Sequence, residues 1–130
     1  AAVLDRRAVG IEGEAVARRF LEDLGFRIVE KNFNCPLGEI DLIAEEGDVL
    51  VFVEVKTRRS ARFGTPAEAV HAKKQRQILR VAEAYMRERR LRGPCRVDVV
   101  GVEFPGQGTE ARVELIRNAV QGTGRQWGGA

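Results

Sequence analysis

The chain has 130 residues, of which 44% are hydrophobic and 32% are charged, and its formal net charge is +3 at pH 7. This length suits one domain and is too short for two. We therefore expect a single domain over residues 1–120, followed by a flexible glycine-rich tail over residues 121–130. No apolar run approaches the roughly 20 residues of a membrane span, and no signal-peptide pattern is present. The sequence therefore predicts a cytoplasmic protein with no membrane partner.

Histidine and cysteine are too scarce for several kinds of active site. His71 is the only histidine, which argues against a zinc enzyme and against a histidine-based triad. Cys35 and Cys95 lie in different segments and lack metal-ligand spacing. We expect them to be reduced, partly buried thiols and not a disulfide.

The first part of the chain is expected to form a helix and a strand. The helix lies near Val9 to Leu24 and ends at Gly25. Val16, Phe20 and Leu24 are expected on one apolar stripe, with Ala17 and Leu21 beside it. A strand over residues 26–32 follows, and residues 32–38 are expected to form a loop because they contain proline and glycine.

The last part of the chain is expected to form a helix and two strands. Thr65 and Pro66 are a strong helix start, and the helix then runs to Leu91. Its predicted core stripe consists of Ile78, Val81, Ala82 and Tyr85. Strands are expected over residues 95–104, where Asp98 is predicted to pair with a basic neighbour, and over residues 111–116. The predicted element order is therefore α-β-β-β-α-β-β.

Residues 38–58 are expected to form a hairpin that carries several charged residues. If Gly47 and Asp48 form a two-residue loop, Asp41 lies opposite Glu54 and Glu39 lies opposite Lys56. Opposed side chains share one face, with Cβ atoms roughly 4.5–5.5 Å apart. A loop one residue earlier would instead place Glu39 opposite Glu54, which still pairs two carboxylates.

Two carboxylates held this close repel each other unless a cation or a proton lies between them. A hard cation such as Mg²⁺ is bound by one or two carboxylates, with water and phosphate oxygens as further ligands. The hairpin therefore predicts a metal site. The alternative is an ordinary salt bridge between Glu54 and Lys56 on a solvated strand face.

Charged residues on the two helices allow similar alternatives. Glu12 and Glu14 are expected in the first turns of the first helix, where they would complement the helix dipole, or Glu14 would reach the metal site. A basic zone follows the hairpin, and it is either a solvated face or a phosphate-binding surface. Its predicted nucleic-acid-binding residues are Arg58, Arg59, Arg62, Lys73, Lys74 and Arg76.

The motifs Gly13-Glu14, Gly38-Glu39-Ile40-Asp41-Leu42-Ile43-Ala44 and Val51-Phe52-Val53-Glu54-Val55-Lys56-Thr57-Arg58 resemble those of the YraN family of small bacterial proteins. The resemblance covers roughly residues 8 to 117. It extends to the PD-(D/E)XK nuclease superfamily and to the archaeal Holliday-junction resolvases, although Ile40 stands where the superfamily name has proline.

This resemblance implies an α/β fold with a restriction-endonuclease-like core, in which helices flank a mixed central sheet. It implies Asp41 and Glu54 as metal-binding carboxylates, with the backbone carbonyl of Val55 and the carboxylate of Glu14 as further ligands. Lys56 would orient or deprotonate the attacking water. Glu39 is a possible additional site residue.

The sequence thus predicts an endonuclease that uses Mg²⁺ or Mn²⁺ to hydrolyse DNA, most plausibly structured or branched DNA, and that could act as a homodimer. One alternative is a non-catalytic nucleic-acid-binding or recombination accessory module with the same fold. Another is a structural domain whose acidic patch binds lysines or arginines of a partner protein.

Overall fold

The structure, a computed structural model, describes residues 6–58, 72–104 and 111–120, with side chains from Gly10 onward. The elements are α1 (Arg6–Asp23), β1 (Arg27–Cys35), β2 (Gly38–Glu46), β3 (Val49–Arg58), α2 (Ala72–Glu88), β4 (Cys95–Glu103) and β5 (Arg112–Val120). This order confirms the predicted one. The expected helix start at Thr65 and the expected flexible tail over residues 121–130 lie outside the described residues.

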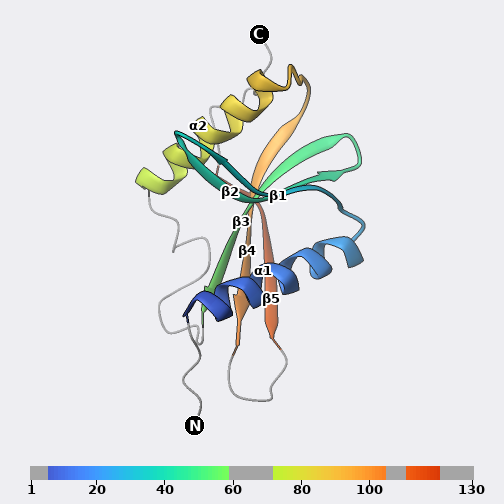
Figure 1. Cartoon of the computed structure of the whole chain (residues 1–130). Coiled ribbons are helices and arrows are strands. Elements are labelled where there is room, and N and C mark those ends of the chain that lie inside the picture. The colour runs from blue at the N-terminus through green and yellow to red at the C-terminus, as the bar shows by residue number, and fades with distance from the viewer. Residues whose placement is uncertain (1–5, 59–71, 105–110, 121–130) are drawn as a thin grey trace.

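The five strands form one mixed sheet in the order β1-β2-β3-β4-β5. Neighbouring strands are antiparallel except β3 and β4, which are parallel and flank α2 in the sequence. The two helices cover opposite faces of the sheet (Figure 1), so each face has its own apolar cluster. The prediction of a mixed α/β sheet flanked by helices is confirmed.

Helix α1 packs on the sheet through small side chains. Ala17 and Leu21 are fully buried against Val51 and Val53 of β3, whereas Leu24 is 48% exposed. The predicted stripe through Val16, Phe20 and Leu24 is therefore wrong by a small rotation of the helix. The physical reason lies one turn earlier, where a glycine lets the helix approach the sheet closely.

That glycine is Gly13, which contacts the C-terminal part of β3. A Cβ atom built on Gly13 would lie 2.0 Å from the hydroxyl oxygen of Thr57, a distance that no packed structure allows. The stripe that begins at Gly13 and continues through Ala17 and Leu21 consequently faces the sheet. This close approach also fixes the position of Glu14, the next residue.

The end of α1 confirms the predicted role of Gly25. Gly25 has a φ of +99°, and its N–H donates to the Glu22 carbonyl at 2.9 Å. The N–H of Phe26 donates to the Leu21 carbonyl, also at 2.9 Å. These two bonds are the Schellman arrangement that commonly ends a helix at a glycine.

Helix α2 covers the other face with the predicted stripe of Ile78, Val81, Ala82 and Tyr85, all buried. The Tyr85 ring packs edge-on against Phe33 of β1 and Phe52 of β3, with centroid distances of 5.0 and 5.7 Å. Tyr85 therefore joins α2 to two strands that are not neighbours in the sheet.

Two strands extend further than their sequence patterns predict. Residues 32–35 continue β1, because Phe33 pairs with Ile40 and Cys35 pairs with Gly38, so the connection to β2 shortens to Pro36 and Leu37. Strand β5 continues to Val120, which pairs with Val97 and is buried. In both cases pairing with a neighbouring strand decides the boundary, and local sequence does not contain that information.

Cys35 and Cys95 are each half-buried and are not joined in a disulfide, as predicted. Among the described residues, neither α1 nor α2 combines the length and the apolar character needed to cross a bilayer.

Candidate metal-binding and nucleic-acid site

The hairpin of β2 and β3 has the predicted register. Glu46 pairs with Val49 and Leu42 pairs with Val53, so Gly47 and Asp48 form the loop, and Gly47 has a φ of +61°. The alternative loop one residue earlier is excluded. Counting on from Leu42 and Val53 brings Asp41 level with Glu54.

Backbone pairing between the two strands stops just before these acids. Instead, the Val55 N–H donates a hydrogen bond of 2.7 Å to the Asp41 carboxylate. In an extended strand the N–H and C=O of one residue point towards the same neighbouring strand. The Val55 carbonyl therefore faces the side on which Asp41 lies, as a metal ligand at that position would require.

The alternation of side chains along β2 also changes at Asp41. Ile43 and Ile40 both pack in the cluster beneath α2, whereas Leu42 packs in the cluster beneath α1. Ile40 and Leu42 therefore lie on opposite faces, although strict alternation along a strand would place them on the same face. Asn32 in the partner strand β1 has a φ of +52°, and this left-handed residue interrupts the pleat beside Asp41.

Glu54 is a buried carboxylate, with 7% of its surface exposed. Burial and the neighbouring charge of Asp41 raise its pKa to about 7, although two lysines oppose this shift. The ammonium group of Lys56 lies 3.6 Å from a Glu54 oxygen, and that of Lys74 lies 3.9 Å from the same oxygen. An ordinary exposed salt bridge is excluded, because this acid is desolvated and contacts a second acid and two cations.

Asp41 is the shared neighbour of two further acids. Burial raises its pKa, the hydrogen bond from Val55 lowers it, and the charge of Glu39 raises it. The Glu14 side chain from α1 interacts with the Asp41 carboxyl group, and burial together with Asp41 raises the Glu14 pKa. Neighbouring carboxyl groups repel each other unless a proton or a cation lies between them.

Glu14 therefore belongs to the acidic site, and the dipole interpretation is wrong for it. Helix α1 begins at Arg6, so its first turn contains no acidic residue, and Glu14 lies in the middle of the helix. Glu12 is exposed and also lies beyond the first turn. Sequence periodicity located the helix but placed its first turn too late.

The possible additional residue Glu39 is exposed on β2. No backbone pair joins β2 to β3 beyond Leu42, so Glu39 is not held opposite Lys56 by the ladder. Its charge nevertheless raises the pKa values of both Asp41 and Glu14. It lies at the edge of the acidic site.

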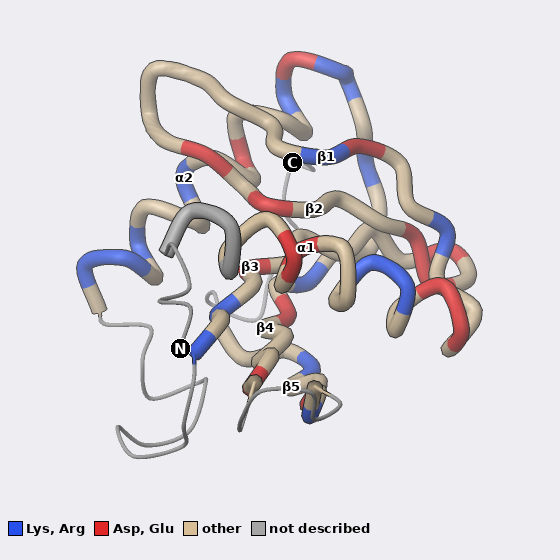
Figure 2. The backbone as a smooth tube through the Cα atoms, turned by 60° about the horizontal axis from the view of Figure 1, so that its bottom comes forward, with Lys and Arg blue, Asp and Glu red and all other residues tan. Residues whose placement is uncertain are grey.

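The predicted basic zone divides into separate parts. Lys73 and Arg76 are exposed on α2, and Arg58 is half-buried at the end of β3. Arg59 and Arg62 lie outside the described residues. Figure 2 shows the basic first half of α2 beside the acidic positions of β2. Lys74 is distinct from the others because it reaches the acid pair.

The oxygen-rich donor set is suitable for a hard cation. Asp41, Glu54 and the Val55 carbonyl supply oxygen ligands, and Mg²⁺ requires only one or two carboxylates when water and phosphate complete its shell. Within residues 6–58, 72–104 and 111–120, no three acidic, histidine or cysteine side chains converge as a complete cage. Glu14 and Glu54 each interact electrostatically with Asp41.

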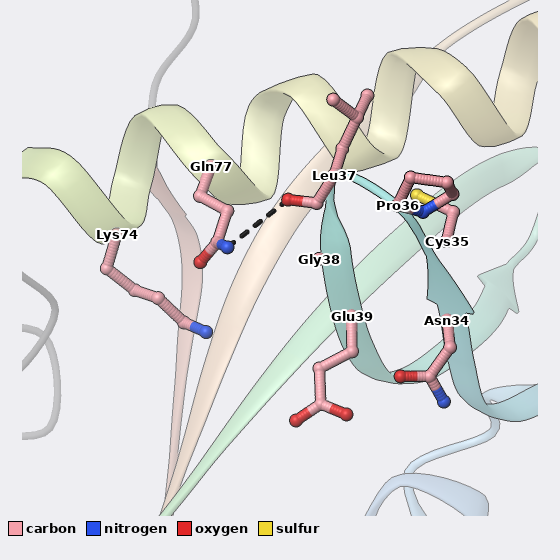
Figure 3. Close-up of a pocket in the computed structure, with 8 residues that line it drawn as sticks. All are labelled: Asn34, Cys35, Pro36, Leu37, Gly38, Glu39, Lys74 and Gln77. Carbon is pink, nitrogen blue, oxygen red and sulfur yellow. Dashed lines mark hydrogen bonds between the residues drawn. The ribbon is translucent and has the colours of Figure 1, made fainter.

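A groove beside these acids was not predicted from the sequence. It is an open cavity of about 380 Å³ between residues 34–39, at the β1–β2 turn, and Lys74 and Gln77 of α2 (Figure 3). The Gln77 amide donates a hydrogen bond of 3.2 Å to the Leu37 carbonyl. In the sequence, the groove could have been suspected only from Lys74 and Gln77, two polar residues one helical turn apart. Only the fold brings these two residues to the hairpin.

Asp98 does not belong to this site. It is fully buried in β4 and accepts hydrogen bonds of 3.0 and 3.2 Å from the Arg96 guanidinium and of 2.8 Å from the Asn118 N–H. The prediction that Asp98 pairs with a basic neighbour is confirmed.

Comparison with known proteins assigns the chain to a family. Residues 13–102, which contain every described acid and lysine of the site, match the Uncharacterised protein family UPF0102. The chain is 47% identical over 117 residues to a UPF0102 protein of Moorella thermoacetica, covering 89% of this chain and 98% of that protein. It is 54% identical over 116 residues to a UPF0102 protein of Symbiobacterium thermophilum, covering 87% and 96%. The protein belongs to the UPF0102 family, and the predicted YraN-like membership is confirmed.

Among solved structures, Pyrococcus furiosus SfsA in complex with Ca²⁺ has a TM-score of 0.39 at 13% identity, over 99% of this chain and 67% of that chain. A similarity at this level supports no conclusion about fold or function.

Proposed function

We propose that the protein is a metal-dependent nuclease with a restriction-endonuclease-like core, related to the PD-(D/E)XK superfamily and to the archaeal Holliday-junction resolvases. The single observation that supports this most strongly is the buried carboxylate of Glu54 beside the half-buried Asp41, with Lys56 on the same strand. Retaining a buried carboxylate next to a second one is costly for stability, so we infer that the two are kept for a function.

In this proposal Asp41, Glu54 and the Val55 carbonyl hold Mg²⁺ or Mn²⁺, and Glu14 assists through Asp41. The bound cation would polarise the scissile phosphate and favour deprotonation of the attacking water. Lys56 would orient this water and offset negative charge on the phosphate. Water forms the new P–O bond, the bond to the leaving oxygen breaks, and that oxygen takes up a proton.

The proposed substrate is DNA, with structured or branched DNA preferred. Lys73 and Arg76, which are exposed on α2, would contact the phosphate backbone without distinguishing sequences, and Arg58, Arg59 and Arg62 are further candidates for such contacts. A homodimer would suit a junction with twofold symmetry. Light scattering with and without a four-way junction tests that assembly.

One observation favours a second candidate, a non-catalytic nucleic-acid-binding or recombination accessory module. Lys56 and Lys74 already offset the charge of Glu54 without any metal. A site compensated in this way could bind nucleic acid and leave it intact.

A cleavage assay separates the two candidates. Labelled single-stranded, duplex, flap and four-way-junction DNAs are incubated with Mg²⁺, Mn²⁺ or EDTA. We expect metal-dependent cutting that falls at least about 100-fold in Glu54→Gln and in Lys56→Ala, since each removes a group acting on the reacting phosphate. The matched controls, Glu114→Gln and Lys31→Ala, change exposed residues and should cut normally.

Cutting that persists in EDTA or in Glu54→Gln would overturn the proposed mechanism. Binding without cutting on every substrate would favour the accessory module.

A further inference from the structure

The groove between the β1–β2 turn and α2 lies beside the acid pair and shares Lys74 with it. Lys74 lines the groove, and its ammonium group lies 3.9 Å from Glu54. Glu39 also lines the groove, and its charge acts on Asp41. Figure 3 shows Lys74 and Gln77 projecting from α2 towards the strand that carries Glu39. A molecule in this groove would therefore lie next to the site of the proposed chemistry.

The two walls of the groove meet at the Gln77 side chain. The Gln77 amide donates its hydrogen bond to the Leu37 carbonyl, which ties the turn to α2. Gly38 has a φ of +143°, and a Cβ atom there would lie 2.8 Å from the Gln77 amide nitrogen. Only glycine permits both this backbone conformation and this close approach. The groove is consequently a built feature of the fold.

The size of the groove limits its occupant. Its volume of about 380 Å³ lies at the lower end of the roughly 300–1,000 Å³ range of small-ligand sites. That space is enough for one nucleotide, whereas an intact duplex would lie across the open groove without entering it.

The lining has the chemistry that one nucleotide requires. Pro36 and the 44% exposed Leu37 offer apolar surface to the face of a base. The amide groups of Asn34 and Gln77 can contact base edges, as proteins do with unpaired bases. Lys74 can pair with a phosphate at the end of the groove nearest the acids.

We propose that this groove holds one unpaired nucleotide of a nucleic-acid strand, immediately beside the phosphate that the acid pair would cleave. This inference rests on the proposed nuclease function and specifies its substrate. The protein requires an unpaired strand at the cleavage position, as in a flap, a junction arm or single-stranded DNA. An uninterrupted duplex does not fill the groove.

Groove occupancy can be measured without any cleavage by thiol labelling. The reporter is Asn34→Cys, an exposed position on the groove, in a background where Cys35 and Cys95 are replaced by alanine. The control reporter is Glu88→Cys, exposed at the far end of α2. Labelling rates are measured in EDTA, with an oligothymidylate of eight residues, with a blunt duplex or with free thymidine monophosphate.

We expect the single strand to slow labelling at the Asn34→Cys position by about tenfold at saturation, and to leave the Glu88→Cys position unaffected. Lys74→Ala should raise the oligonucleotide concentration needed for half-maximal protection by about tenfold. This change in affinity corresponds to the loss of one charge-assisted contact. The matched control Lys31→Ala changes an exposed lysine on β1, which does not line the groove, and should retain protection.

Equal protection by the blunt duplex would overturn the proposal, and so would oligonucleotide binding that leaves the reporter fully reactive. Protection by thymidine monophosphate at least equal to that by the strand would also overturn it, because the groove would then be a free-nucleotide site. Metal-dependent cleavage without protection of the Asn34→Cys reporter would refute nucleotide binding in the groove and leave the nuclease function standing. Protection without cleavage would refute the nuclease and retain the groove as a binding site.

Discussion

At the scale of single residues, Asp41 connects the parts of the site. It lies where the pairing of β2 with β3 ends, accepts the Val55 N–H, and interacts with Glu14 from α1. Its charge also raises the pKa of Glu54. Because one residue takes part in all these contacts, Asp41→Ala should disturb the site more than the loss of Glu14.

Replacing Glu54 tests whether the acid pair is kept at a cost to stability. In EDTA at pH 8, we expect Glu54→Gln to unfold at a higher temperature than the wild type, because it removes a desolvated carboxylate beside Asp41. The gain should be on the order of 1–3 kcal/mol. Thermal unfolding followed by circular dichroism measures it.

Adding Mg²⁺ should raise the unfolding temperature of the wild type, because a ligand that binds only the folded state stabilises it. The same addition should have little effect on Glu54→Gln. The control Glu114→Gln should behave like the wild type in both conditions. A Glu54→Gln variant less stable than the wild type in EDTA would show that the lysines outweigh the desolvation of the acid.

At the scale of elements, the contact between α1 and β3 positions Glu14. Gly13→Ala would place a Cβ atom against the side chain of Thr57 and push the helix away from the sheet. We expect a loss of about 1–3 kcal/mol in the free energy of unfolding, as in other overpacked contacts. Urea denaturation measures this loss.

Two further variants separate this clash from a general effect on the helix. Gly10→Ala lies in the same helix, has no heavy atom of the described structure within 4 Å of the new Cβ, and should stabilise the protein by up to about 1 kcal/mol. Combining Gly13→Ala with Thr57→Ala should recover part of the loss. A Gly13→Ala protein as stable as Gly10→Ala would contradict the close approach of α1 to β3.

The ends of three strands are joined by an ion-pair cluster on Glu46 of β2. Arg96 of β4 and Arg117 of β5 both bind its carboxylate, and they hold its pKa below the ordinary value of 4.5. A carboxyl group with a lowered folded-state pKa stabilises the fold above its unfolded-state pKa. Its contribution is lost as the pH falls through that range.

We therefore expect Glu46→Gln to be less stable than the wild type at pH 7, by up to about 1 kcal/mol because the cluster is partly exposed. The difference should shrink as the pH falls below 4.5 and vanish in strong acid. Urea denaturation across this pH range measures it. A difference that is constant with pH would show that packing, and not charge, is responsible.

At the scale of the whole molecule, the Tyr85 ring holds one layer to another. It is buried, contacts Phe33 and Phe52, and lies 4.4 Å beneath the Arg89 guanidinium, which pairs with Glu30 of β1 at 2.9 Å. Losing this ring would loosen α2, and α2 carries one wall of the groove and the lysine that reaches Glu54.

We expect Tyr85→Ala to cost about 3–5 kcal/mol, a large part of the 5–15 kcal/mol that stabilises a typical domain. Tyr85→Phe should cost less than about 1.5 kcal/mol, because only the 3.4 Å contact from Arg89 to the hydroxyl is lost. The control Leu24→Ala removes a side chain that is 48% exposed and should change stability by about 0.5 kcal/mol or less. Chemical denaturation ranks the three variants.

The sequence by itself determined the order of the elements and the register of the hairpin. Period-2 and period-3.6 patterns are local, and the two-residue loop at Gly47 and Asp48 fixes which residues face each other. The proximity of Asp41 to Glu54 therefore followed from counting along the chain. The core stripe of α2 followed from its spacing in the same way.

Only the tertiary structure decided how the site is completed. Glu14 joins Asp41 because Gly13 lets α1 approach β3, and Lys74 reaches Glu54 because α2 crosses the hairpin from the other face. The groove beside them exists because Gln77 holds the turn at Leu37. Each of these contacts joins segments that are distant in the sequence, and no local pattern encodes where distant segments meet.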